Sequence, residues 1–201
     1  MGGALMNLEK TIKNLRLRGF RASHFASGEE AAAYLAGQIQ GCTVGFGGSK
    51  TLDQLGLYER LGQNNTVYWH WKAPGKETRR QAVFTDVYCC SANAISEDGE
   101  IFNIDGTGNR VAGTLFGHDR VFIVAGTNKI CPDFDAALKR ARNTAAVQNA
   151  ARLDKKTPCR IDGVCHDCHG KEGICRALTV LWGPMNGMET EIVLIDGDWG
   201  L

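Results

Sequence analysis

The sequence predicts an α/β fold with a mostly parallel sheet, helices on both faces and one β-hairpin excursion. Short apolar runs of strand length alternate with helix-forming segments, and this alternation is typical of parallel sheets. A turn signal, Asp98 followed by Gly99, stands between two further apolar runs and predicts the hairpin. Five runs have the length of buried strands: residues 42–46, 66–71, 86–90, 121–125 and 192–195.

The first two helices are expected before the first strand. Leu8, Ile12 and Leu15 share one helical face within residues 7–18, and Gly19 follows at the position where helices often end. The tetrapeptide at residues 27–30 has the S-x-x-E form of a capping box. We therefore expect a second helix that continues through residue 39.

The later elements follow the same alternation. A helix is expected at about residues 51–61 after the first strand, and a polar helix at about residues 76–83 after the second. The hairpin at residues 94–103 precedes the most apolar strand. Asp133 is then expected to open a long helix that reaches about residue 153.

The composition favours one intracellular domain spanning residues 1–201. With 23 Lys and Arg against 22 Asp and Glu, the chain has no excess positive charge that would attract nucleic acid or an anionic membrane. No apolar run approaches the roughly 20 residues that span a bilayer, and the N-terminus lacks a signal-peptide pattern. We therefore expect a cytoplasmic protein, whose eight cysteines would stay reduced and available for thiol or metal chemistry.

A glycine-rich turn after the first strand is a candidate binding element. Gly47 and Gly48 let backbone amides converge on an anion, while Ser49, Lys50 and Thr51 supply further contacts. The turn is not a Walker A loop, because Ser49 separates Gly48 from Lys50, and it is not a G-x-G-x-x-G loop. The alternative is a plain strand-to-helix turn with Ser49 or Thr51 as its cap.

Three separated motifs carry a resemblance to a known family. They are the turn at residues 45–52, the polar run at residues 93–110 and the tetrapeptide at residues 127–130. In this order they resemble the LUD-domain family, named for lactate utilisation, over about residues 7–201. The resemblance implies a fold similar to ribose-5-phosphate isomerase, glucosamine-6-phosphate deaminase and the CoA transferases. It also implies a role beside iron–sulfur and other redox subunits that oxidise lactate to pyruvate.

The resemblance further implies a ligand cleft made of the glycine-rich turn and two other loops. Arg110 would pair with a carboxylate or phosphate, Lys129 would add a point charge, and Asp105 would hold a hydroxyl or take a proton. This set suits a small carboxylate or a phosphate ester. The alternative is a structural turn at residues 105–108 with a solvated Arg110. The other cleft residues would be Asn103, Gly106, Gly108, Asn109 and Asn128.

Glu97 is a candidate nucleophile on the hairpin. Residues 96–99 resemble the Ser-Glu-Asn-Gly turn of many CoA transferases, with Asp98 in place of Asn. In that case Glu97 would form an acyl anhydride and then a thioester with CoA. Ordinary turn composition is the alternative.

A cysteine-rich insert at residues 157–176 interrupts the alternation. Four thiols in one short segment suit a zinc ion or an iron–sulfur cluster. Their spacing matches neither a ferredoxin run nor a paired zinc ribbon, so the identity of the metal stays open, and four unliganded thiols are the alternative. The candidate ligands are Cys159, Cys165, Cys168 and Cys175. Cys42, Cys89, Cys90 and Cys131 are instead expected in the core.

Three functions compete at this point. A redox accessory or ligand-binding subunit for lactate or a related hydroxy acid follows from the resemblance and the cysteines. An enzyme acting on a sugar phosphate or an acyl-CoA follows from Glu97 and Asp105, and a metal-dependent binding or regulatory protein follows from the cysteines alone. The aromatic run at residues 68–71 favours sheet packing over ligand stacking. Substrate, partner subunits and oligomeric state stay open.

Overall fold

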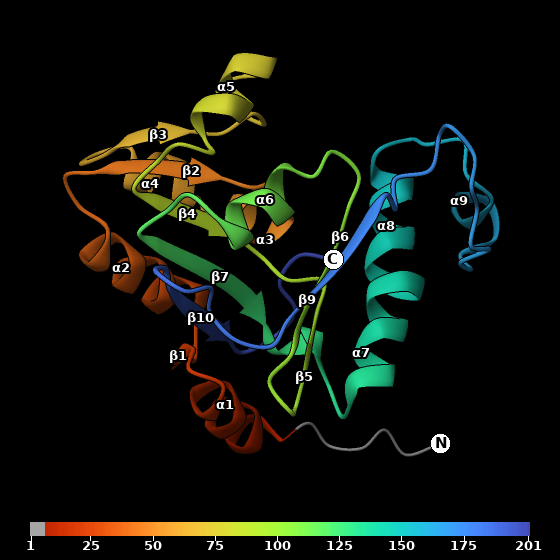
Figure 1. The fold of residues 1–201 in the computed structure, drawn as a ribbon, viewed down its shortest axis with the longest axis horizontal. Coiled ribbons are helices and arrows are strands. Elements are labelled where there is room, and N and C mark those ends of the chain that lie inside the picture. Colours follow the sequence, from red (N-terminus) through yellow and green to blue (C-terminus); the bar gives the residue numbers. More distant parts are fainter. Residues whose placement is uncertain (1–6) are drawn as a thin grey trace.

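The computed structural model describes residues 7–201, and their larger sheet is wholly parallel (Figure 1). Its strands are, in spatial order, β1 (Arg21–Phe25), β10 (Glu189–Ile195), β7 (Arg120–Gly126), β4 (Val87–Cys90), β2 (Thr43–Phe46) and β3 (Thr66–Tyr68). Each predicted strand outside the hairpin lies in this sheet. The predicted α/β class with a mostly parallel sheet is therefore confirmed.

The predicted hairpin belongs to a second, smaller sheet. Its strands are, in spatial order, β8 (Ile130–Cys131), β5 (Ala94–Ser96), β6 (Ile101–Asp105) and β9 (Ala177–Leu181). Strands β5 and β6 pair in antiparallel fashion around Asp98 and Gly99, and Gly99 has a φ of 85° that the turn requires. The predicted hairpin is therefore the centre of a separate four-stranded sheet, in which β8 pairs with β5 and β9 pairs with β6.

Helices cover the larger sheet on one face, and a helix and the smaller sheet cover the other. Helices α2 (Gly28–Gln38), α3 (Lys50–Gln54) and α4 (Leu57–Leu61) contribute Leu35, Leu52 and Leu57 to a core with Val44, Phe46 and Val124 of the sheet. Helix α1 (Leu8–Leu17) buries Leu15 in the opposite core, together with Ile95 and Ile101 of the smaller sheet.

The long helical segment after β8 covers the outer side of the smaller sheet. It consists of α7 (Phe134–Arg140), a π-helical stretch η2 (Ala141–Ala145) and α8 (Ala146–Arg152). Asp133 caps its start by accepting from the amide of Ala136 at 2.8 Å, so the predicted start is confirmed. Ala137 and Ala141 pack against Phe102 in a third core cluster.

Local signals also explain the other helix starts. The capping box predicted at Ser27 and Glu30 forms at the start of α2. Ser49 accepts from the amide of Leu52 at 3.2 Å and caps α3. The remaining short helices are α5 (Lys76–Gln81), α6 (Asn109–Leu115), η1 (Thr127–Lys129) and α9 (Pro158–Asp162).

The structure corrects several element predictions. The single helix expected at about residues 51–61 is two helices, because Gly56 between α3 and α4 adopts a φ of 60° and ends the first. The strand expected to reach residue 71 ends at Tyr68. Strands β1, β8 and β9 and helices α6 and α9 were not predicted.

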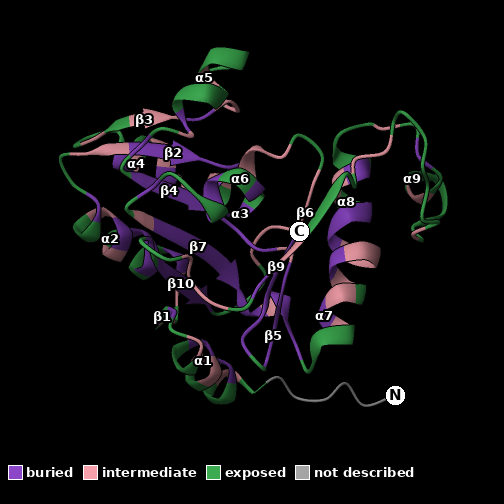
Figure 2. Ribbon diagram, viewed as in Figure 1, coloured by how far each residue is buried: buried purple, intermediate pink, exposed green. Residues whose placement is uncertain are grey.

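Burial follows these layers (Figure 2). Six of the seven residues of β7 and six of the seven residues of β10 are buried, so these two central strands of the larger sheet lie in the protein core. Among residues 7–201, no helix combines the length and the apolar character needed to cross a membrane.

Candidate functional site

A cavity of about 580 Å³ opens at the carboxyl edge of the larger sheet. The segments that follow β2, β4 and β7 reach it with Gly48, Ser91 and Lys129. Ligands of open parallel sheets bind at this edge, where the strands end and the connecting loops converge. Helices α6 and α8 and the segment at residues 171–176 complete the walls.

The glycine-rich turn after β2 forms one wall. The amide of Gly47 donates to the carbonyl of Cys89 at 2.9 Å, which holds the turn against β4. A Cβ atom on Gly48 would lie 3.1 Å from Nε1 of Trp71, so the absence of a side chain allows the indole to close over the turn. Gly48 and Trp71 both line the cavity.

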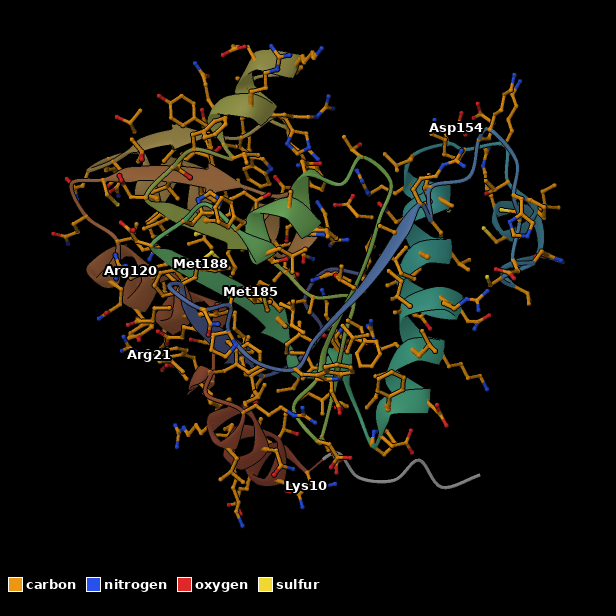
Figure 3. All side chains as sticks on the ribbon, viewed as in Figure 1. Lys10, Arg21, Arg120, Asp154, Met185 and Met188 are labelled. Carbon is orange, nitrogen blue, oxygen red and sulfur yellow. The ribbon has the colours of Figure 1, made fainter. Side chains whose placement is uncertain are left out.

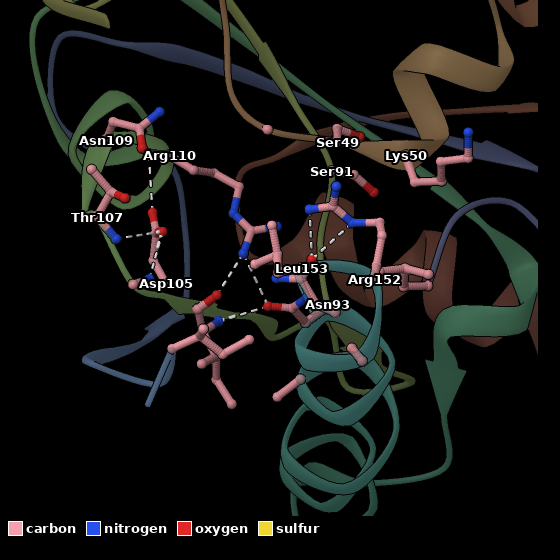
Figure 4. A pocket seen from close by; sticks show the side chains of 18 of the residues that line it. Ser49, Lys50, Ser91, Asn93, Asp105, Thr107, Asn109, Arg110, Arg152 and Leu153 are labelled. Carbon is pink, nitrogen blue, oxygen red and sulfur yellow. Dashed lines mark hydrogen bonds between the residues drawn. The ribbon is translucent and has the colours of Figure 1, made fainter. Parts of the chain in front are cut away.

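Asp105 at the end of β6 organises the start of α6. One carboxylate oxygen accepts from the amides of Gly106 and Thr107, at 2.8 and 3.3 Å. The other accepts from the amides of Arg110 and Val111, at 3.0 and 3.2 Å. Both oxygens therefore stabilise the loop and the first turn of the helix (Figure 4).

Arg110 carries positive charge from α6 into the cavity. Its Nη2 donates to the carbonyl of Ile104 at 2.5 Å and to Oδ1 of Asn93 at 3.2 Å. Asn93 is fixed in turn, because the same oxygen accepts from the amide of Ile104 at 2.7 Å. The guanidinium is thus held in place by neutral oxygens.

Lys129 is a buried amine on the cavity floor. Its Nζ donates to Oγ of Ser91 at 3.0 Å, to the carbonyl of Ala92 at 3.1 Å and to Oγ1 of Thr51 at 3.2 Å. Burial lowers its pKa to about 7, and the positive charges of Arg140 and Arg110 contribute to the shift. Burial therefore disfavours the charged form of this amine relative to an exposed lysine.

A further cation, Arg140, lies near Lys129. Arg140 of α7 donates from Nε to the carbonyl of Asn128 at 3.1 Å and from Nη1 to the carbonyl of Asn93. Burial lowers its pKa. The loop that follows β4 is therefore contacted by Lys129, Arg110 and Arg140 together.

The wider cavity is strongly basic. Arg152 enters from α8, where Oδ1 of Asn149 accepts from its Nε and Nη2 at 3.1 and 2.8 Å (Figure 4). Asp105 and Glu172 are the acidic side chains that line the cavity within residues 7–201. Eight lining residues are basic: Lys50, Arg79, Arg110, Lys129, Arg152, Lys155, Lys171 and Arg176.

Comparison with known proteins decides the family. The LUD domain family model matches residues 8–195. The chain belongs to the LUD-domain family. A crystal structure of a DUF162 family protein from Deinococcus radiodurans has a similar fold, with a TM-score of 0.54 at 14% identity, over 94% of this chain and 96% of that one. A search of the curated proteins found no match.

The structure of this LUD domain brings most of the predicted ligand residues together. Asn103 is fully buried, and neither of its side-chain polar atoms has a hydrogen-bond partner in the described part of the chain. Lining the cavity are Gly48, Ser49, Lys50, Thr51, Asp105, Gly106, Asn109, Arg110 and Lys129. Outside its lining lie Gly47, Asn103, Gly108 and Asn128.

Glu97 lies apart from this cavity, at the N-terminal end of α1. Its Oε1 accepts from the amide of Asn7 at 2.9 Å, and its Oε2 lies 3.4 Å from Nζ of Lys10, which is labelled in Figure 3. The carboxylate therefore joins the hairpin to α1. The predicted nucleophile and the predicted ligand residues do not meet.

The four cysteines of the insert gather around α9 and the loop that follows it. Cys159 and Cys165 are half-buried, and Cys168 and Cys175 are exposed. Arg142 of η2 donates from Nη2 to Sγ of Cys165 at 3.9 Å. Across residues 7–201, no three His, Cys, Asp or Glu side chains lie in an arrangement that could hold a metal ion.

Sequence reasoning missed much of the cavity wall. Asn93 was included in the polar run but given no role, although its position directly after a buried strand was a usable signal. Trp71 was assigned to sheet packing, and it does stack on Trp69 with ring centroids 5.5 Å apart. Other lining residues that no sequence signal identified include Arg79, Ser91, Ala92, Asn149, Arg152 and Lys155.

Proposed function

We propose that this LUD domain is a ligand-binding subunit in the oxidation of lactate or a related hydroxy acid, and that its cavity holds a small organic anion. The observation that carries the proposal is the pair Lys129 and Arg110. Both line the cavity, and their side-chain hydrogen bonds within residues 7–201 go to neutral oxygens. Family membership supports the link to lactate utilisation.

Electrostatics favours an anion at this place. Burying a cation such as Lys129 without a countercharge is costly, and the positive charge of the half-buried Arg140 adds to this cost. A carboxylate or phosphate between Lys129 and Arg110 would offset this cost and would raise the pKa of Lys129 toward its ordinary value. Arg110 is suited to bind such a group through two parallel hydrogen bonds.

The distribution of charge favours a ligand with two anionic groups. Lys129 and Arg110 lie at the carboxyl edge of the sheet, whereas Arg152 and Arg176 belong to other walls of the cavity. A phosphorylated carboxylate carries one anionic group for each set, whereas a monocarboxylate such as lactate carries a single anionic group. Ligand sites of this volume are common for metabolites and cofactors.

The enzymatic alternatives draw less support from the site. The carboxylate of Glu97 bonds to Asn7 and Lys10 outside the cavity, which gives no support to an acyl-CoA transfer at the cavity. Asp105 lines the cavity, but both of its oxygens bond to backbone amides. A ligand-binding role needs neither group as a nucleophile or base.

Thermal unfolding and calorimetry test the proposal with lactate, pyruvate, phosphoenolpyruvate and ribose 5-phosphate. A ligand at about 100-fold above its Kd stabilises the fold by about 2.7 kcal/mol. We expect phosphoenolpyruvate to bind more tightly than lactate and Arg110→Gln to weaken both. The absence of binding by all four compounds would contradict the proposal, and equal binding to wild type and Arg110→Gln would place the anion elsewhere.

A further inference from the structure

The segment that carries the last cysteine of the insert is also a wall of the anion cavity. Lys171, Ile174 and Arg176 line the cavity, and Cys175 stands between the last two. The amide of Arg176 donates to the carbonyl of Asp105 at 2.9 Å. The cysteine loop and the loop that starts α6 are thus joined directly through the backbone.

The contact between these two loops is close. A Cβ atom on Gly106 would lie 2.8 Å from the carbonyl oxygen of Ile174, so the absence of a side chain at Gly106 permits the approach. Nη2 of Arg176 donates to the carbonyls of Lys171 and Gly170, at 2.9 and 3.1 Å. Nζ of Lys155 on the α8 side lies 3.7 Å from Oε2 of Glu172. Movement of residues 170–176 would therefore move cations of the cavity.

The donor set of the insert fits a thiophilic metal. Four cysteines fall within residues 159–175, and a guanidinium of η2 donates to Sγ of one of them. Four thiolates are the ligands of structural zinc ions and of iron–sulfur clusters. The sulfurs do not yet form a metal-holding arrangement in the described chain, and Cys168 and Cys175 are exposed. Metal binding would therefore require the loop to contract.

We propose that Cys159, Cys165, Cys168 and Cys175 hold one thiolate-bound metal centre, and that its binding fixes the wall at residues 170–176 and strengthens anion binding. The second half rests on the proposed function of the cavity. Because the loop must contract to bind metal, and because the same loop places Lys171 and Arg176 at the cavity, the two events share one structural change. Linkage makes the effect reciprocal, so a bound anion strengthens metal binding by the same factor.

Metal loading of the full chain is the first part of the test. Metal-free protein is loaded with Zn²⁺ alone or, without oxygen, with Fe²⁺, Fe³⁺ and sulfide, and bound metal is measured by elemental mass spectrometry. We expect one centre per chain in at least one of the two loadings. Cys168→Ser should lose it. The matched control Cys42→Ser should keep it, because Cys42 lies near Asn65 at the other end of β2, outside the insert.

Hydrogen exchange of the same samples tests the structural link without any anion. Loading should slow exchange of the amides of residues 104–110 and 170–176 by about fivefold or more in wild type and Cys42→Ser, and should leave Cys168→Ser unchanged. Bound metal with unchanged exchange at residues 104–110 would overturn the link between the centre and the wall. Equal metal content in all three proteins would overturn the metal site itself.

Calorimetry with inorganic sulfate tests the anion half. Sulfate should bind the loaded protein about fivefold or more tightly than the metal-free protein, a change within the usual range of coupling between two sites. Equal sulfate affinity in the two forms would overturn the coupling. Absence of sulfate binding in both forms would contradict the proposed anion cavity, and the exchange measurement would then still decide whether the centre fixes the wall.

Discussion

The guanidinium of Arg152 lies over the ring of Trp71, with Cζ 4.6 Å from the ring centroid. Arg152 ends α8, and Trp71 follows β3, so the contact joins the helical wall of the cavity to the edge of the larger sheet. The same indole faces Gly48 of the glycine-rich turn. One aromatic ring therefore orders two walls of the cavity.

A double-mutant cycle between Arg152 and Trp71 should show this contact. Arg152→Gln and Trp71→Leu should each lower the free energy of unfolding, with a coupling of about 0.5–1 kcal/mol between them, because a cation over an indole has roughly this strength. Urea unfolding of the four proteins gives the coupling. Additive effects of the two substitutions would show that the ring and the guanidinium do not interact.

Gly48→Val should abolish anion binding with a modest loss of stability. The new side chain would meet the indole of Trp71, since even a Cβ atom would lie 3.1 Å from Nε1. Gly37→Val is the control, because a Cβ atom on Gly37 has nothing within 4 Å. Calorimetry with phosphoenolpyruvate gives the affinities, and unchanged affinity in Gly48→Val would show that the turn has only a structural role.

Arg110→Lys should weaken binding of a carboxylate or phosphate ligand by about 1–3 kcal/mol, because an ammonium cannot reproduce the paired donors of a guanidinium. The substitution also removes the bonds from Nη2 to Ile104 and Asn93. Arg60→Lys is the matched control, since Arg60 pairs with Glu29 and does not line the cavity. Equal calorimetric affinity of wild type and Arg110→Lys would place Arg110 outside the binding site.

Lys129 should make stability rise with pH above neutrality. Its folded-state pKa of about 7 lies below the ordinary value of 10.5, so the unfolded chain binds more protons between these values. Stability rises with pH wherever the unfolded state binds more protons. Urea unfolding at about pH 7 and about pH 10 should therefore show a gain for wild type relative to Lys129→Met. Parallel pH profiles of the two proteins would mean that Lys129 keeps an ordinary pKa.

Much of the fold could be predicted because short local motifs mark the ends of helices and the position of the hairpin turn. The cap at Asp133, the box at Ser27 and the turn at Gly99 each form as predicted. Strand β1 was missed because it is a polar edge strand, with a burial pattern that alternates only partly. Strand β9 is half-exposed at an edge of the smaller sheet, although its sequence at residues 177–181 is mostly apolar.

The site was harder to predict than the fold because its walls come from distant parts of the chain. The motifs identified Lys129 and Arg110, which follow β7 and β6. The role of Arg152 could not be predicted, because a basic residue at the C-terminal end of a helix is common on protein surfaces. The position of Glu97 depends on how α1 packs against the hairpin, and turn composition does not encode that packing.

The π-helical stretch at Ala141–Ala145 changes how the long helix presents its two ends. A π turn contains one residue more than an α turn, and one residue corresponds to a rotation of about 100° around the helix axis. The helix can therefore bury Ala137 against the smaller sheet and still direct Asn149 and Arg152 to the cavity. Because the wide turn absorbs one extra residue, deleting a single alanine from this stretch would leave a regular α-helix in which the cavity-facing residues of α8 keep their orientation.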